Sequence, residues 1–196
     1  MNENQSSAHV LEVARQGATA YLRVLGRATF TTGPVLKQFG AAAIADGCTR
    51  MVLDVAACEG MDSTFMGVLA GLATRLARQS GGAMLMLNVP DNLLEVLRTL
   101  GLDQLMECRR LGAAPEPLAA LPFSAQTLRP IPAVSADLPT TRNVMLDAHS
   151  DLAAVSAENQ LRFKDVLAYL REDGRRTAED RQRTTDQANR DNAHIP

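Results

Sequence analysis

The 196-residue sequence contains no tryptophan, and aromatic residues make up only 4% of it. Since 46% of the residues are nevertheless hydrophobic, the chain can bury a core, which must be built mainly from aliphatic side chains. Its cysteines, Cys48, Cys58 and Cys108, are odd in number and form no Cys-x-x-Cys pair. This pattern fits buried free thiols in a reducing compartment better than a disulfide framework.

Two further absences narrow the class of partner and the compartment. The formal net charge is −2, so no basic excess indicates nucleic acid or an anionic membrane as a partner. No apolar run approaches the roughly 20 residues of a membrane span. The polar start, MNENQSSAH, lacks the cationic and apolar regions of a signal peptide. We therefore expect a soluble, cytoplasmic protein.

The sequence lacks the residue patterns that metal sites and catalytic sites need. The histidines, His9, His149 and His194, are scattered, and none is followed by a cysteine or an aspartate at i+3 or i+4. There is no phosphate-binding loop and no dinucleotide-binding glycine pattern. Cys58 and Cys108 are interpreted as small buried residues rather than nucleophiles. We therefore expect no metal site, no cofactor and no enzymatic activity, with histidines that are incidental or on the surface.

Residues 9–112 show the hydrophobic patterns of strands and helices in alternation. A hairpin is predicted at 9–16 and 19–25, and further strands at 50–55, 83–89 and 105–108. Apolar stripes predict helices from about 32 to 46, from 63 to the glycines at 81–82, and from 91 to 100. The expected fold class is α/β. It has a single mixed, mostly parallel sheet of about five strands, with an N-terminal hairpin and helices packed on it.

The rest of the chain divides into four segments of different composition. Residues 1–8 are expected to be disordered. Residues 113–140 hold six of the nine prolines and are interpreted as an extended linker. Residues 141–171 are predicted to form a C-terminal helical extension in two parts, the second capped by Ser156. Its apolar face must pack on the domain, on a copy of itself or on a partner. Residues 172–196 are predicted to be a disordered, charged tail.

The most informative stretch is GMDSTFMG, residues 60–67, where the pattern changes from strand to helix. Asp62 is placed to cap the helix, because its carboxylate can accept a hydrogen bond from the backbone N–H of Thr64 or Phe65. This structural role alone would explain the aspartate. A hydroxyl in the first helical turn is also a suitable phosphate carrier, because it lies at the positive end of the helix dipole. The added charge would disturb any partner docked there.

This stretch also carries a family resemblance. MDSTFMGVL, residues 61–69, resembles the M-D-S-(S/T)-G-x-G-(V/L) signature of STAS domains, the anti-sigma factor antagonists. LLEVLRTLGLDQLM, residues 93–106, is similar to the R-x-L-(F/L)-x-x-x-G-L segment of the family, and the glycines at 26, 81 and 82 also match. The resemblance covers roughly residues 9–110, so residues 9–112 are interpreted as a STAS-like domain.

The resemblance implies a protein-binding regulatory module that is not itself an enzyme. Ser63 would be the phosphoacceptor, with Thr64 as the alternative. A serine kinase of the anti-sigma type would phosphorylate it, and a phosphatase would restore binding to the anti-sigma factor or kinase in a bacterial partner-switching pathway. The residues expected to contact the partner lie in the motif and in the loop after the second strand: Asp62, Thr64, Phe65, Met66, Arg27 and Thr29.

The sequence departs from the family pattern at two places. Phe65 stands where the family has glycine, and could shield Ser63 or enlarge a docking patch. The loop Gly26–Thr29 lacks the acidic residue usual in the family's antagonists.

One alternative function is a constitutive STAS scaffold or transporter-associated subunit without a phosphorylation switch. Another is oligomerisation, with a homodimer formed through the C-terminal extension.

Overall fold

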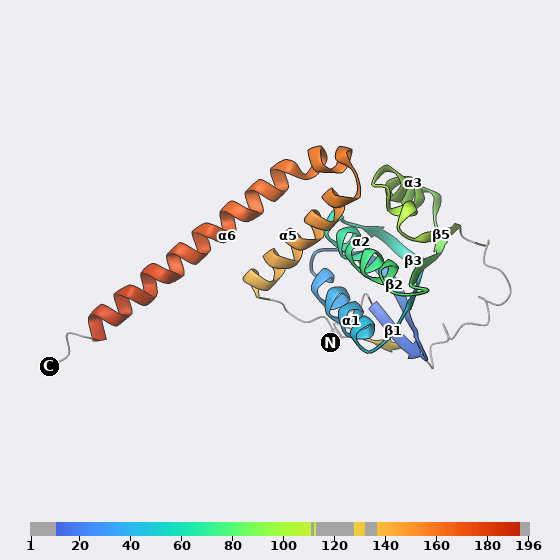
Figure 1. Cartoon of the computed structure of the whole chain (residues 1–196), viewed down its shortest axis with the longest axis horizontal. Helices are drawn as coiled ribbons and strands as arrows, with labels where there is room; N and C mark the ends of the chain where they lie inside the picture. Colours follow the sequence, from blue (N-terminus) through green and yellow to red (C-terminus); the bar gives the residue numbers. More distant parts are fainter. Residues whose placement is uncertain (1–10, 111, 113–127, 132–136, 193–196) are drawn as a thin grey trace, which may run out of the picture.

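The computed structural model describes residues 11–110, 112, 128–131 and 137–192. Within them lies one six-stranded sheet, with helices against one face of it and a further helical layer outside those (Figure 1). None of the helices in these ranges combines the length and the apolar character that crossing a membrane requires. The predicted disordered N-terminus, residues 1–8, lies outside the described residues.

The sheet has the strand order β5-β4-β3-β2-β1-β6. Strands β2, β3, β4 and β5 are parallel neighbours, and β1 pairs antiparallel with β2 and with β6. This confirms the mixed, mostly parallel sheet and the N-terminal hairpin, which turns at Gly17 with a positive φ of 56°. The strands are β1 Leu11–Gln16, β2 Thr19–Ala28, β3 Arg50–Met61, β4 Ala83–Val89, β5 Glu107–Arg110 and β6 Arg129–Pro130.

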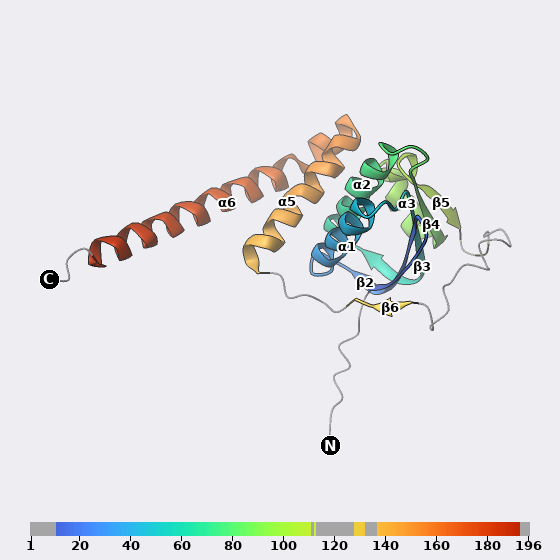
Figure 2. The same ribbon diagram turned by 60° about the horizontal axis from the view of Figure 1, so that its bottom comes forward.

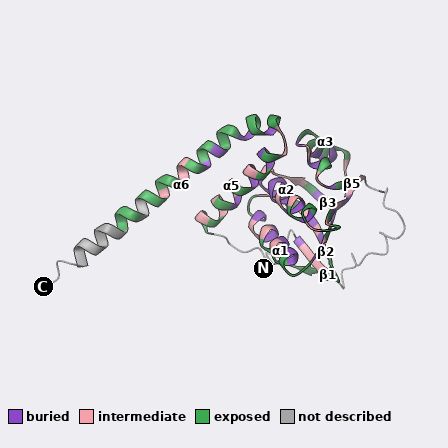
Figure 3. Cartoon of the chain, viewed as in Figure 1, coloured by how far each residue is buried: buried purple, intermediate pink, exposed green. Residues whose placement is uncertain are grey.

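Helices α1 and α2 build the core against one face of the sheet. The helices of the domain are α1 Gly33–Ala45, α2 Ser63–Ala77 and α3 Asp91–Thr99, followed by a 3₁₀ turn at Leu102–Gln104. The apolar stripe of α2 is fully buried, as its spacing of three and four residues predicts. The stripe consists of Phe65, Leu69, Leu72 and Leu76. Figure 3 shows this burial at the centre of the molecule.

The C-terminal extension packs on the domain itself. Helix α5, Leu138–Val155, lies against α2 and α1, and helix α6, Ala157–Asn192, packs back on α5 (Figure 2). Ser156 separates them, and its hydroxyl accepts a hydrogen bond of 3.1 Å from the backbone N–H of Asn159, as the sequence predicted. Packing within the chain, the first of the three predicted places, thus buries Phe163, Leu167 and Leu170 of the apolar face, whereas Leu161 and Val166 stay exposed.

Two segments differ from the sequence prediction. Within the predicted linker, residues 128–131 include β6, which pairs with β1, and Leu128 is buried. Helix α6 continues to Asn192, where a disordered tail was expected from 172. Ion pairs at i+3 and i+4 explain part of this, because Glu172 bonds both Arg175 and Arg176 along the helix. Residues 113–127, 132–136 and 193–196 lie outside the described residues.

Candidate functional site at the start of helix α2

The site lies where two neighbouring parallel strands end. Ala28, the last residue of β2, is paired with Met61, the last residue of β3. Asp62 follows Met61, and its backbone N–H donates to the carbonyl of Ala28 over 3.0 Å. Because the carboxyl ends of parallel strands share one edge of a sheet, this register brings the loop after β2 beside the start of α2.

Asp62 joins this loop to the helix with its two carboxylate oxygens. Oδ1 accepts the backbone N–H of Phe65 over 2.8 Å, which confirms the predicted cap of α2. Oδ2 accepts the backbone N–H of Phe30 over 2.6 Å. Thr32 stands at the N-cap of α1, and its hydroxyl donates to the backbone carbonyl of Thr29 rather than capping the helix. The loop is therefore held in place from both ends.

We expect Asp62→Ala to lower the free energy of unfolding by about 0.5–2 kcal/mol, because α2 loses its cap. Asp62→Asn is the matched control. Asparagine caps as well as aspartate, so it keeps the bond to Phe65, but its amide group cannot accept the N–H of Phe30. Urea denaturation of the two variants checks this. Equal losses in both would contradict the assignment of the larger effect to the cap.

Ser63 is half-buried, and its hydroxyl is bonded to a histidine from the extension. Ser63 Oγ lies 3.0 Å from His149 Nε2, across 86 residues of sequence. The other ring nitrogen, Nδ1, lies 2.7 Å from the carbonyl oxygen of Met145. Since a carbonyl oxygen can only accept, Nδ1 carries a proton, and in the neutral ring Nε2 accepts the Ser63 hydroxyl.

His149 is therefore neither incidental nor on the surface. Its side chain is only 4% exposed, and its ring packs edge-on against Phe163 of α6, with ring centroids 5.4 Å apart. His149 directly follows Ala148, which lies on the buried stripe of α5. This neighbour was the only sign in the sequence that the histidine is buried. Nothing in the sequence indicates its pairing with Ser63, because that contact depends on how α5 returns to α2.

The other predicted partner-binding residues divide into two groups. Thr64, Phe65 and Met66 are buried, with Phe65 0% exposed, so in this conformation they cannot contact a partner. Phe65 points into the core and neither covers Ser63 nor adds to a docking patch. Arg27 is exposed and Thr29 is half-buried. Between them and the helix lies a residue that the sequence analysis missed, Phe30, whose side chain is 44% exposed.

Close approach of α5 to α2 is made possible by two glycines one helical turn apart. A Cβ atom at Gly67 would collide with the backbone carbonyl of Ala148, and one at Gly71 would collide with the carboxylate of Asp151. Lys37 of α1 adds an ion pair to Asp147 of α5. The outer face of α2, including the hydroxyl of Ser63, is thus covered by the extension.

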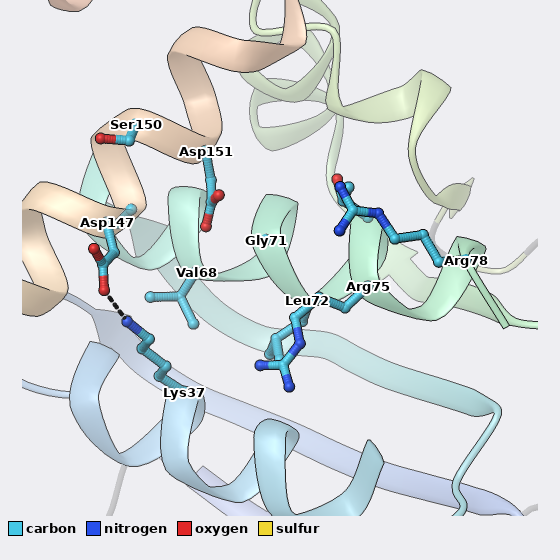
Figure 4. A pocket seen from close by; sticks show the side chains of 11 residues that line it. Lys37, Val68, Gly71, Leu72, Arg75, Arg78, Asp147, Ser150 and Asp151 are labelled. Atoms are coloured by element: carbon cyan, nitrogen blue, oxygen red, sulfur yellow. Dashed lines mark hydrogen bonds and ion pairs between the residues drawn. The ribbon is translucent and has the colours of Figure 1, made fainter. Parts of the chain in front are cut away.

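A cavity of about 310 Å³ opens between α1, α2 and α5 (Figure 4). Its walls carry both signs of charge, from Lys37, Arg75 and Arg78 and from Asp147 and Asp151. Burial, and to a smaller extent the nearby carboxylate of Asp147, raises the pKa of Asp151. Ser63 and His149 are not among the lining residues of this cavity.

Cys58 of β3 and Cys108 of β5 are poor nucleophiles. Burial raises the pKa of Cys58, and it raises the pKa of Cys108 to about 11. Because the thiolate is the reactive form, both thiols are largely unreactive at neutral pH. Cys58 is buried, as predicted, whereas Cys108 is only half-buried.

Comparison with known proteins assigns the domain. The family model described as "Mlab, STAS domain" matches residues 11–107. Residues 11–107 are a STAS domain. The matched range ends at the start of β5, so α5 and α6 lie outside the STAS domain that they cover.

Solved structures with a similar fold include anti-sigma factor antagonists. SpoIIAA in its unphosphorylated form is 19% identical, with 56% of this chain and 93% of that chain covered and a TM-score of 0.46. The Bacillus cell fate determinant SpoIIAA in its phosphorylated form is 21% identical, with 56% and 95% covered and a TM-score of 0.45. An anti-sigma factor antagonist from Mycobacterium paratuberculosis is 21% identical, with 53% and 87% covered and a TM-score of 0.45. No curated protein matches the chain.

Proposed function

We propose that the protein is a non-catalytic, protein-binding regulatory module of the anti-sigma factor antagonist type, switched by phosphorylation of Ser63. The observation that carries this proposal is the position of Ser63 in a STAS domain. It is the first residue of α2, directly after the capping Asp62, with a side chain that is only half-buried. The partner would be an anti-sigma factor or a kinase of that type, and a phosphatase would reverse the switch.

Phosphate at this position would act mainly through its charge. Phosphoserine brings about −1.5 to −2 charges at neutral pH, and here it would stand beside the carboxylate of Asp62. Exposed residues on the adjoining segment include Arg27 at the end of β2 and Phe30 in the loop that Asp62 holds. A partner docked on Phe30 would have to desolvate the phosphate or leave. Arg27 and Phe30 are therefore the residues that we propose for partner contact.

A second function is favoured by the hydrogen bond between Ser63 and His149. That bond gives Ser63 a structural role in holding α5, which a serine in a constitutive scaffold or a transporter-associated subunit would also have. In that case the domain would bind its partner without a phosphorylation switch. The two functions differ in how binding responds to a charge at position 63.

Affinity capture with three full-length variants separates the two functions. For a switch, we expect Ser63→Ala to retain a cellular partner that Ser63→Asp loses. Ser80→Asp adds the same charge in the exposed turn after α2 and serves as the control. Equal capture by Ser63→Ala and Ser63→Asp would support the constitutive scaffold. Mass spectrometry of the peptide containing Ser63 tests phosphorylation directly, and a peptide that is unmodified whether the partner is bound or released would contradict the switch.

A further inference from the structure

The extension occupies the same face of α2 on which Ser63 stands. Three contacts of α5 follow one another along that face: His149 on Ser63, Ala148 on Gly67 and Asp151 on Gly71. Val144 and Leu152, the apolar residues of α5 on either side of these contacts, are buried. A hydroxyl at position 63 is therefore part of an intramolecular helix–helix interface, as well as the proposed site of modification.

We infer that phosphorylation of Ser63 and docking of α5 on α2 oppose each other, so that α5 is a cis-acting cover of this surface. The inference rests on the proposed function in taking Ser63 as the phosphoacceptor. It goes further because it names the first target of the phosphate as a helix of the same chain. By linkage, docking of α5 disfavours the phosphorylated state of Ser63 by the same free energy by which the phosphate disfavours docking.

The opposition follows from the chemistry of the bond. Phosphorylation replaces the Ser63 hydroxyl hydrogen, which is the proton donated to His149 Nε2 in the neutral ring. The phosphate oxygens are acceptors and meet the lone pair of Nε2, which is also an acceptor. If Ser63 instead rotates its phosphate to the solvent, a buried ring nitrogen loses its partner. Both outcomes weaken the contact between α5 and α2.

One arrangement would preserve the contact, and the surroundings of His149 oppose it. The ring could take a proton and donate it to the phosphate, but its charge would then leave water for a nearly fully buried position against Phe163, a desolvation cost that offsets the attraction of the ion pair. The ring also has little room to retreat from an added phosphate. Its Nδ1 is bonded to Met145, and the Ala148 backbone beside it already touches Gly67.

Release of α5 need not disturb the rest of the domain. The start of α6 has its own contact with α3, because Asn159 Nδ2 donates to the carbonyl oxygen of Leu100 at the end of α3 over 2.9 Å, besides its bond of 3.0 Å to the carbonyl oxygen of Leu152 in α5. Arg162 adds a bond of 3.1 Å to the carbonyl oxygen of Thr99. Ser156, between the two helices, has an extended backbone and can act as the hinge. The expected change is therefore local opening of α5 rather than unfolding.

The test uses the full chain with phosphoserine incorporated at position 63 during translation, so that no kinase is needed. Amide hydrogen exchange is measured over residues 138–155. We expect exchange there to become roughly tenfold faster or more, which is the effect of leaving one buried acceptor without its bond. Phosphoserine at position 80 is the matched control and should leave this exchange unchanged. Unchanged or slower exchange with phosphoserine 63 would overturn the inference, slower exchange indicating that His149 binds the phosphate.

His149→Ala tests whether the histidine transmits the effect. This variant should itself speed exchange of α5, and adding phosphoserine 63 to it should then have a smaller effect than in the parent chain. An undiminished effect of the phosphate in His149→Ala would contradict the role of the histidine. The result is independent of the capture experiment. Equal capture by Ser63→Ala and Ser63→Asp would refute the proposed switch of partner binding, whereas protection of α5 unaffected by phosphate would refute only the inference.

Discussion

Replacing Phe65 by alanine is expected to lower the free energy of unfolding by about 3–5 kcal/mol. The ring is fully buried in the core between α2 and the sheet, in line with Leu69, Leu72 and Leu76. Truncation removes its burial and leaves a cavity that its neighbours can fill only in part. The loss would be a large share of the 5–15 kcal/mol that typically stabilises a folded domain. Urea denaturation of the full chain measures it.

Phe30 provides the matched control for this prediction. It is the same residue type in the adjacent loop, but 44% of its side chain is exposed, so Phe30→Ala should change stability by no more than about 0.5 kcal/mol. If Phe65→Ala does not fold, Phe65→Leu keeps the measurement possible and should show an intermediate loss. Similar stability of Phe65→Leu and the parent chain would mean that the aromatic ring is not tightly packed.

The burial of Phe65 could be predicted from its helical spacing, although the family resemblance suggested a surface role. Its spacing from Leu69, Leu72 and Leu76 places it on the buried stripe of α2, and this stripe was visible in the sequence. The resemblance to a family with glycine at this position nevertheless directed attention to a surface role. The helical period decided the outcome, because a ring on the inner face of α2 cannot reach the outer face where Ser63 lies.

Local patterns predicted most of the fold. The hairpin, the parallel strands and the three helices of the domain follow from periods of two and 3.6 residues, and the Asp62 cap follows from a side chain next to a helix start. The pair Ser63–His149 could not be predicted in this way. It joins residues 86 positions apart through the packing of α5, which no local pattern encodes. The length of α6 was missed because helix-stabilising ion pairs were interpreted as the charge pattern of a disordered tail.

Gly67 is the position in α2 where a single added methyl group should have the largest effect on α5. We expect Gly67→Ala to displace α5 or to lower the free energy of unfolding by about 1–3 kcal/mol, the usual cost of overpacking. The new Cβ atom would meet the backbone carbonyl of Ala148, which can move only if the whole helix moves. The effect should exceed the gain of roughly 0.5–1 kcal/mol that alanine brings to a helix interior. Urea denaturation and hydrogen exchange of residues 138–155 measure the two outcomes.

Gly71→Ala is the matched control, one turn further along the same helix. Its Cβ atom would meet the carboxylate of Asp151, a side chain that can rotate into the adjoining cavity. Rotation would also relieve the burial that raises the pKa of this carboxyl. Gly71→Ala should therefore be neutral or up to about 1 kcal/mol more stable, with α5 still protected. If both variants behave alike, the clash at Ala148 is not decisive, and α5 has more freedom on α2 than its packing on Gly67 implies.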